Sequence, residues 1–440
     1  MTMITPQVKE SVIRLMTRLA IQYKAINLSQ GFPNEPPPAK LRLALAHAVL
    51  SGKVWSDDEA TRLSHATAND LSASIVSLLT RPASDTPSDE ITDEINQYSP
   101  PMGRADVRRA VSDYYRRLYE YEISEDNITL TLGATEAVAT ALRTISSPGD
   151  KIVIFEPFHE LYPSQCNIFY LDPVYVTLHA TFDGEWNYDY EELTSAITDK
   201  KTKALILNTP HNPTGKVFTH FELSEIVNLC IENDVYIITD EIYEHMTYQD
   251  KNSNHCQHIL IPKSFPKAAD RTLVCNSLGK SASATGWRLG WCLHPRHLSS
   301  QYRGVHDQLV AMSPHPQQFA SLAYFTLPDE YFKDELQMRY QSRVKMLAEA
   351  LTEVGFGVTT PQGAYYLFVH YRGVHQLKEF SPMDAAMYMM RDVGVAVVPG
   401  DNFYGKSSDG QNYLRFAACR SLSDVTTAIQ KIRANLSKSV

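Results

Sequence analysis

The sequence has no closely spaced pair of cysteines, no long apolar run and no block of basic residues. Zinc sites and thiol-exchange sites usually need CxxC pairs, and the six cysteines stand singly, so we predict no metal site. No apolar stretch approaches the roughly 20 residues that span a bilayer. The formal net charge is −9, and lysine and arginine are spread along the chain. Nucleic acids and membranes are therefore poor candidates as partners.

The N-terminal segment lacks the apolar core of a signal peptide. Between positions 12 and 19 its apolar residues recur at helical spacing, which predicts an amphipathic helix. Isolated cysteines suit a reducing compartment, and we therefore expect a cytoplasmic protein. The same segment carries several basic residues and one acid, Glu10, which leaves a weak organelle-targeting role open.

Short apolar segments alternate with amphipathic stretches from about residue 128 to about residue 295. The segments are ITLTLG, KIVIFEP, DPVYVTL, KALILNTP, VYIITDE, TLVCNSLG and GWCLHP. They are apolar throughout, as strands are in a sheet that helices cover on both faces. We predict an α/β domain with a mostly parallel, seven-stranded sheet, and we expect its ligands beyond the carboxyl ends of the strands.

The last hundred residues have a different pattern. A charged amphipathic helix at about 329–354 precedes four segments typical of short strands, a helix at about 383–393 and a closing helix from Ser423. The four segments are GVTTP, AYYLFVHY, VAVVPG and YLRFAAC. This pattern predicts a smaller α+β domain.

At 440 residues the chain exceeds one ordinary domain. We predict a large domain at 45–325, a small C-terminal domain at 326–440 and an N-terminal segment, 1–44, that packs with the small domain. Residues 53–94 are polar and have few aromatics, which indicates a surface insertion. Within it, Asp70 and the apolar residues that follow predict one short helix that Asp70 caps.

Lys280 follows a buried strand in the motif SLGKSASATGWRLGW and lies among small residues. An imine-forming lysine needs such neighbours, because they leave room for a flat ring. Ser277 and Arg288 offer a hydroxyl and a guanidinium, which bind a phosphate dianion well. In TLGATEAVATAL, Ala134 and Thr135 begin a helix whose amides also favour an anion. A lone loop lysine is usually just solvated, but together these groups predict a phosphate-binding cup.

Two further polar motifs follow buried strands. In VYIITDE, Asp240 ends the predicted strand, and Tyr243 comes three residues later. A buried acid needs a partner such as a protonated ring nitrogen, although aspartate in this position is also a common helix N-cap. NTPHNPTGKVF places Asn212 in a turn that would be structural on its own. Beside the other motifs, Asn212 is a candidate donor to a ring oxygen and to a substrate carboxylate.

The ordered set of motifs resembles the class I/II aminotransferases of fold type I across nearly the whole chain. The motifs are GATEA, NTPHNPTG, DEIYE, SLGKSASATGWRLG and YLRFAAC. INLSQGFPNEPPP, INQYSPPMG and NTPHNPTGKVF are most similar to the kynurenine aminotransferase branch, whose members also act on glutamine, methionine and aromatic substrates. The resemblance implies an enzyme that uses pyridoxal 5'-phosphate (PLP) to transfer an amino group between an L-amino acid and a 2-oxo acid.

The resemblance also implies a role for each motif residue. Lys280 carries PLP as a Schiff base and Asp240 pairs with the pyridine nitrogen. Asn212 and Tyr243 hold the phenolate oxygen. The phosphate is bound by Ser277, Arg288, Ala134 and Thr135. The freed amine of Lys280 then takes the Cα proton of the substrate.

Arg415 in YLRFAAC matches the arginine that binds the substrate α-carboxylate, with help from Gly31 and Asn212. A strand arginine is otherwise a surface residue, but its apolar neighbours favour burial with a partner. Tyr98 matches a tyrosine that reaches the phosphate of the neighbouring subunit, which implies a homodimer. His159 in EPFHELY is a departure, because the family usually has an aromatic ring there to stack on the cofactor.

Two other functions stay open at this point. The same carbanion can eliminate a leaving group from Cβ, which would make the chain a cysteine-S-conjugate β-lyase. A PLP-binding homologue without catalysis is the other alternative. The motifs do not select the amino donor, because Arg415 recognises only the α-carboxylate.

Overall fold

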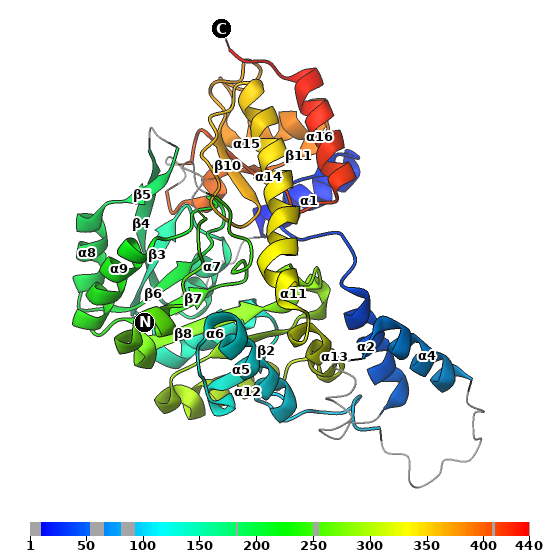
Figure 1. Ribbon diagram of the computed structural model, residues 1–440. Coiled ribbons are helices and arrows are strands. Elements are labelled where there is room, and N and C mark those ends of the chain that lie inside the picture. Colours follow the sequence, from blue (N-terminus) through cyan, green and yellow to red (C-terminus); the bar gives the residue numbers. More distant parts are fainter. Residues whose placement is uncertain are drawn as a thin grey trace. The chain divides into compact units, whose positions relative to one another are not determined.

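The computed structural model describes residues 10–52, 66–80, 93–181, 184–249, 255–406 and 410–439 (Figure 1). The chain forms two compact units. The first unit comprises Met1–Glu35, Ile145–Ile259 and Phe332–Val440, and the second comprises Pro36–Thr144 and Leu260–Tyr331. Among the described helices, none is long and apolar enough to cross a membrane. The domain boundaries at 44/45 and 325/326 stay a prediction.

The first unit contains the parallel strands. They are β3 (Lys151–Glu156), β4 (Asp172–Ala180), β6 (Thr202–Asn208) and β7 (Tyr236–Asp240), in the order β7-β6-β3-β4. A short strand that we did not predict, β5 (Trp186–Tyr188), pairs with β4 in antiparallel orientation. Helices α7 (Leu161–Ile168), α8 (Tyr190–Thr198) and α9 (His220–Glu232) pack against these strands. The central strands β6 and β7 are buried almost throughout, which explains their continuous apolar sequence.

The same unit holds two smaller sheets. Strands β10 (Tyr366–His370), β13 (Tyr413–Ala417) and β12 (Val398–Pro399) form an antiparallel sheet in that order. Strand β1 (Ile26–Asn27) pairs in parallel with β11 (Val395–Ala396), so the N-terminal segment joins the C-terminal region as predicted. The helices here are α1 (Val12–Gln22), α14 (Leu336–Glu353), α15 (Pro382–Tyr388) and α16 (Leu422–Asn435).

One predicted strand is wrong. GVTTP makes only an isolated antiparallel bridge, between Gly357 and His370. The reason is local, because the amide of Thr360 donates to Gly184 O (3.0 Å) and Pro361 has no amide to give.

The second unit has three antiparallel strands, β2 (Ile128–Thr131), β9 (Gly290–Leu293) and β8 (Thr272–Ser277), in that order. Its main helices are α2 (Ala39–Ser51), α4 (Ala68–Leu79), α5 (Ala105–Tyr119), α6 (Ala134–Ile145), α12 (Ser299–Val310) and α13 (His315–Phe325). All seven apolar segments from the middle of the sequence are therefore strands, and the α/β fold class is confirmed.

Helix α4 lies within the predicted insertion and packs on α2. Its N-cap is Thr67, not Asp70 as we predicted. Thr67 and Asp70 form a capping box, in which each side chain accepts a hydrogen bond from the other residue's amide (3.2 and 2.9 Å). Asp70 thus stands at the third helical position, which is where an acid completes such a box. Residues 53–65 and 81–92 lie outside the described part of the chain.

Candidate active site

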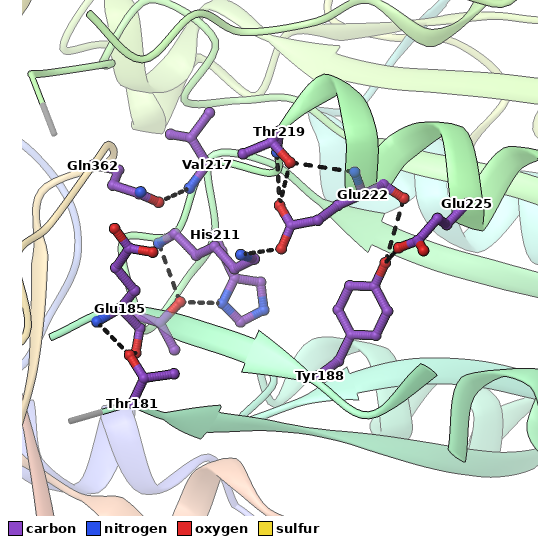
Figure 2. Close-up of polar contacts among 11 residues, drawn as sticks. Thr181, Glu185, Tyr188, His211, Val217, Thr219, Glu222, Glu225 and Gln362 are labelled. Carbon is purple, nitrogen blue, oxygen red and sulfur yellow. Dashed lines mark hydrogen bonds and ion pairs between the residues drawn. The ribbon is translucent and has the colours of Figure 1, made fainter. Parts of the chain in front are cut away.

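Asn212 lies in the loop after β6, and a network of hydrogen bonds fixes this loop (Figure 2). His211 Nδ1 is 2.8 Å from Thr214 Oγ1, and Lys216 Nζ donates to Glu222 Oε1 (2.6 Å) at the start of α9. Burial and the charge of Lys216 lower the pKa of His211 to about 3, so His211 is neutral. The loop therefore presents Asn212 (3% exposed) from a rigid support.

Asp240 ends β7, directly opposite Asn208 in the strand register. Its carboxylate is buried, and Oδ2 accepts a hydrogen bond from the hydroxyl of Tyr162 (2.7 Å) on α7. The ring of His159 meets that of Tyr162 edge-on at a centroid distance of 5.7 Å. His159, for which the resemblance implies a place against the cofactor ring, thus contacts the tyrosine that donates to Asp240. The sequence did not predict either of these contacts of Tyr162, although Tyr162 and His159 both lie in the motif EPFHELY.

Tyr243 is buried, and its hydroxyl oxygen lies 2.8 Å from that of Tyr366 on β10. Burial, together with the neighbouring Tyr366 and Asp240, raises the pKa of Tyr243 well above its usual value. Tyr243 therefore stays protonated at physiological pH and can donate a hydrogen bond.

Arg415 on β13 is 1% exposed. Its Nη1 donates to Asn212 Oδ1 (3.0 Å) and its Nη2 to Ser29 O (2.6 Å). The rings of Tyr366 and Phe403 lie against the guanidinium, with centroids 4.6 and 4.9 Å from Cζ. Within the described ranges, no carboxylate pairs with it, and Nε has no hydrogen-bond partner. A buried cation of this kind is costly unless an anion is supplied.

The second unit brings the predicted phosphate-binding residues together around Gly290. In the strand register, Gly290 lies between Thr131 of β2 and Ser277 of β8. A Cβ on Gly290 would come within 2.9 Å of the amide nitrogen of Ala134 at the start of α6. Only a glycine permits this close approach, which sets Ser277 beside the first turn of α6. That turn includes Thr135.

Arg288 is held at the same turn. Its guanidinium donates to Thr285 O (3.0 Å) and Leu132 O (3.2 Å). Gly133 has φ +78°, and a Cβ there would lie 2.7 Å from Arg288 Nη2. The helix N-terminus and the guanidinium thus share one cradle, which a larger residue at 133 would fill.

Two more predicted residues lie in this unit. Lys280 is half-buried on the short helix α11 (Leu278–Ser281), which directly follows β8. Tyr98, in the loop before α5, is 83% exposed.

Comparison with known proteins decides the family. A sequence model described as Aminotransferase class I and II matches residues 68–432. The chain belongs to the class I and II aminotransferases. It is 32% identical to the probable kynurenine–oxoglutarate transaminase BNA3 of Saccharomyces cerevisiae (77% of this chain, 80% of the relative). It is 30% identical to human kynurenine–oxoglutarate transaminase 1 (94% and 93%). The structure of Escherichia coli YbdL, identified as a methionine aminotransferase, matches with a TM-score of 0.81 and 25% identity (98% of each chain).

This aminotransferase is therefore a PLP-dependent enzyme that transfers amino groups between amino acids and 2-oxo acids, as predicted. The donor groups of the chain fit both charged ligands of such a reaction. In the second unit, the helix start and Arg288 offer hydrogen-bond donors that suit a phosphate. In the first unit, the buried guanidinium of Arg415 suits a carboxylate.

A buried charge pair supports the turn that follows Asp240. Glu241 is fully buried, and its two oxygens accept hydrogen bonds from Thr239 (2.8 Å) and His258 Nε2 (2.8 Å). Burial alone would lower the pKa of His258, but the charges of Glu241 and Glu244 raise it above its usual value. The pair therefore stabilises the fold fully below the unfolded pKa of histidine, about 6.5, and loses this effect as pH rises through the folded pKa.

We expect Glu241→Gln to lower the free energy of unfolding by about 3–5 kcal/mol at pH 6, because it leaves a buried charge without its partner. The difference from the native chain should shrink as pH rises. Urea unfolding at several pH values measures both effects. Glu225→Gln is the control, since Glu225 is half-buried and accepts only a 3.2 Å hydrogen bond from Tyr188 (Figure 2). A pH-independent difference would contradict the prediction.

Proposed function

We propose that the amino donor of this aminotransferase is an L-amino acid without a second carboxylate, either aromatic or hydrophobic or of the kynurenine, methionine or glutamine type. The observation that carries the proposal is Arg415, a buried guanidinium whose described partners are all neutral. The α-carboxylate of a substrate would supply the missing anion. The rings of Tyr366 and Phe403 line this position and favour an apolar ligand over a second carboxylate. The kynurenine and methionine transaminases among the relatives support the same class of donor.

We also propose a role for each cofactor-binding residue. PLP supplies a ring that withdraws the electrons left on Cα when its proton departs. Lys280 Nζ would hold PLP covalently and, once displaced by substrate, move the Cα proton. Asp240 would keep a proton on the ring nitrogen, and its hydrogen bond from Tyr162 keeps the carboxylate oriented. Asn212 and Tyr243 would donate to the phenolate oxygen.

The phosphate would be held by the cradle in the second unit. The amides of Ala134 and Thr135, the hydroxyl of Ser277 and the guanidinium of Arg288 provide its donors. We propose that His159 lies against the ring of PLP. We further propose a homodimer, in which Tyr98 reaches the phosphate in the partner subunit. The exposure of Tyr98 (83%) supports this, because an aromatic side chain with so few contacts in its own chain is free to meet a second one.

Reductive fixation tests the cofactor assignment. Borohydride treatment of the native protein should attach PLP irreversibly, and peptide mapping should find it on Lys280. Fixation on Lys216 would contradict the proposal. We do not expect this result, because the ion pair of Lys216 with Glu222 makes it a poor nucleophile. Sedimentation of the same preparation tests the dimer.

A panel of amino donors against several 2-oxo acids tests the substrate class. Kynurenine, phenylalanine, methionine and glutamine should be better donors than aspartate, because aspartate would bring a second carboxylate. A thioether conjugate belongs in the panel as well. Pyruvate release from it at a higher rate than any amino transfer would favour the β-lyase over the proposed function.

A further inference from the structure

We propose that Tyr366 is a positioning residue, which orients the Tyr243 hydroxyl through its own hydroxyl and the Arg415 guanidinium through its ring face. The inference rests on the proposed roles of Tyr243 and Arg415. No motif pointed to Tyr366, which begins the apolar strand β10 directly after Tyr365. Three contacts within the first unit carry the argument.

The first contact is the hydrogen bond of 2.8 Å between the hydroxyls of Tyr366 and Tyr243. Each hydroxyl has a single proton to donate. If Tyr243 gives its proton to the phenolate oxygen of PLP, Tyr366 must be the donor between the two tyrosines. A hydroxyl that accepts a hydrogen bond becomes a stronger donor itself, because neighbouring bonds in a chain polarise one another. Tyr366 would therefore strengthen the contact from Tyr243 to the cofactor.

The second contact is with Arg415. The ring centroid of Tyr366 lies 4.6 Å from Cζ, so the guanidinium faces the negative side of the aromatic ring. Asn212 and Ser29 hold the ends of the guanidinium at Nη1 and Nη2. The ring of Tyr366 fixes its plane and hence the direction in which a carboxylate can bind.

The third contact explains a glycine. A Cβ on Gly31 would lie 1.9 Å from the hydroxyl oxygen of Tyr366, which is far inside contact distance. The hydroxyl of Tyr366 thus occupies the space that a side chain at 31 would need. Gly31 is also one of the predicted substrate-binding residues, so Tyr366 contacts two of them, Gly31 and Arg415, and Arg415 in turn donates a hydrogen bond to the third, Asn212.

The surroundings keep both tyrosines protonated. Burial raises the pKa of Tyr366 to about 12, and that of Tyr243 is raised as well. The other titratable groups that act on the pair are Asp240, Tyr365, Arg415 and Cys419. A change in the cofactor spectrum near neutral pH would therefore report the proton on the Lys280 imine and not a tyrosine.

The experiment is a pH titration of the visible absorption of the PLP-loaded, full-length protein. A donor to the phenolate oxygen weakens the hold of that oxygen on the imine proton. Tyr366→Phe removes the proton donor to Tyr243, so the midpoint pH of the absorption change should rise by about half a unit to one unit. A shift of this size corresponds to the net free energy of one neutral hydrogen bond. KM for the amino donor should change by less than about threefold, because the phenyl ring still faces Arg415.

Two further variants distinguish the role of the Tyr366 hydroxyl from the role of its ring. Tyr366→Leu should move the midpoint and also raise KM by about tenfold, because it removes the aromatic face. Gly31→Ala should push the Tyr366 hydroxyl away and move the midpoint in the same direction. The matched control is Tyr248→Phe, which removes another fully buried hydroxyl of the first unit that donates to the carbonyl of Ala364 and not to Tyr243.

An unchanged midpoint in Tyr366→Phe and Gly31→Ala would overturn the inference. Covalent fixation at Lys280 in the same proteins would show that the proposed function itself still holds. Absence of the visible band from the native protein would instead refute the proposed function, and the inference with it.

Discussion

Replacing Lys280 by arginine should lower the rate of amino transfer by about 10³-fold or more. A positioned general base alone contributes about 10²- to 10⁴-fold, and Lys280 would also supply the covalent link to PLP. Arginine keeps the positive charge, but it stays protonated at any accessible pH and is a poor base and nucleophile. The loss should appear in kcat and not only in KM, since Arg415 still binds the carboxylate.

Two measurements distinguish this result from misfolding. The variant should lose reductive fixation of PLP, yet it should still bind PLP reversibly, because Ser277, Arg288 and the start of α6 are unchanged. Lys263→Arg is the control in the same unit, since the exposed Lys263 bonds to Glu120 O (2.8 Å) and has no assigned role. A Lys280→Arg protein with more than about a tenth of native activity would contradict both proposed roles of Lys280.

Much of the site could be predicted because its residues follow strands directly. Asn212 comes after β6, Asp240 ends β7 and Lys280 comes after β8. A run of apolar residues identifies a buried strand, and polar residues at its carboxyl end are then conspicuous. Arg415 could be predicted for a different reason, because it is a charged residue inside the apolar segment YLRFAAC. The predicted burial of Arg415 is confirmed.

The missed residues depend on contacts between distant segments. Tyr366 is 123 positions from Tyr243, and Tyr162 is 78 positions from Asp240. Both are buried tyrosines, and the sequence does not distinguish them from core residues, because their roles depend on the partners of their hydroxyls. The strand prediction for GVTTP was wrong for a similar reason. The amide of Thr360 donates to Gly184 O, which lies far away in sequence. Local pattern identifies elements, whereas tertiary contacts decide such pairings.

Arg415→Met should lower kcat/KM for every amino donor by about 30- to 5,000-fold, which corresponds to about 2–5 kcal/mol for a buried charge pair. The effect should be similar across donors, because the α-carboxylate is common to all of them. The stability of the ligand-free protein should behave differently. Since the partners of Arg415 among the described residues are neutral, removing its charge relieves a burial cost, and unfolding should be little affected or slightly harder.

Arg343→Met is the matched control, because it removes a second buried arginine of the same unit that already has an acid partner. Arg343 donates to both oxygens of Glu35 (3.0 and 2.7 Å), and these hydrogen bonds, together with its charge, lower the pKa of that carboxyl group. Its loss should therefore destabilise the fold and leave KM nearly unchanged. A stable Arg415→Met protein with low kcat/KM, beside a destabilised Arg343→Met protein with normal KM, would separate a guanidinium that binds substrate from one that stabilises the fold. If Arg415→Met were as unstable as Arg343→Met and still bound its donors normally, Arg415 would be a structural residue, and the carboxylate site would have to lie elsewhere.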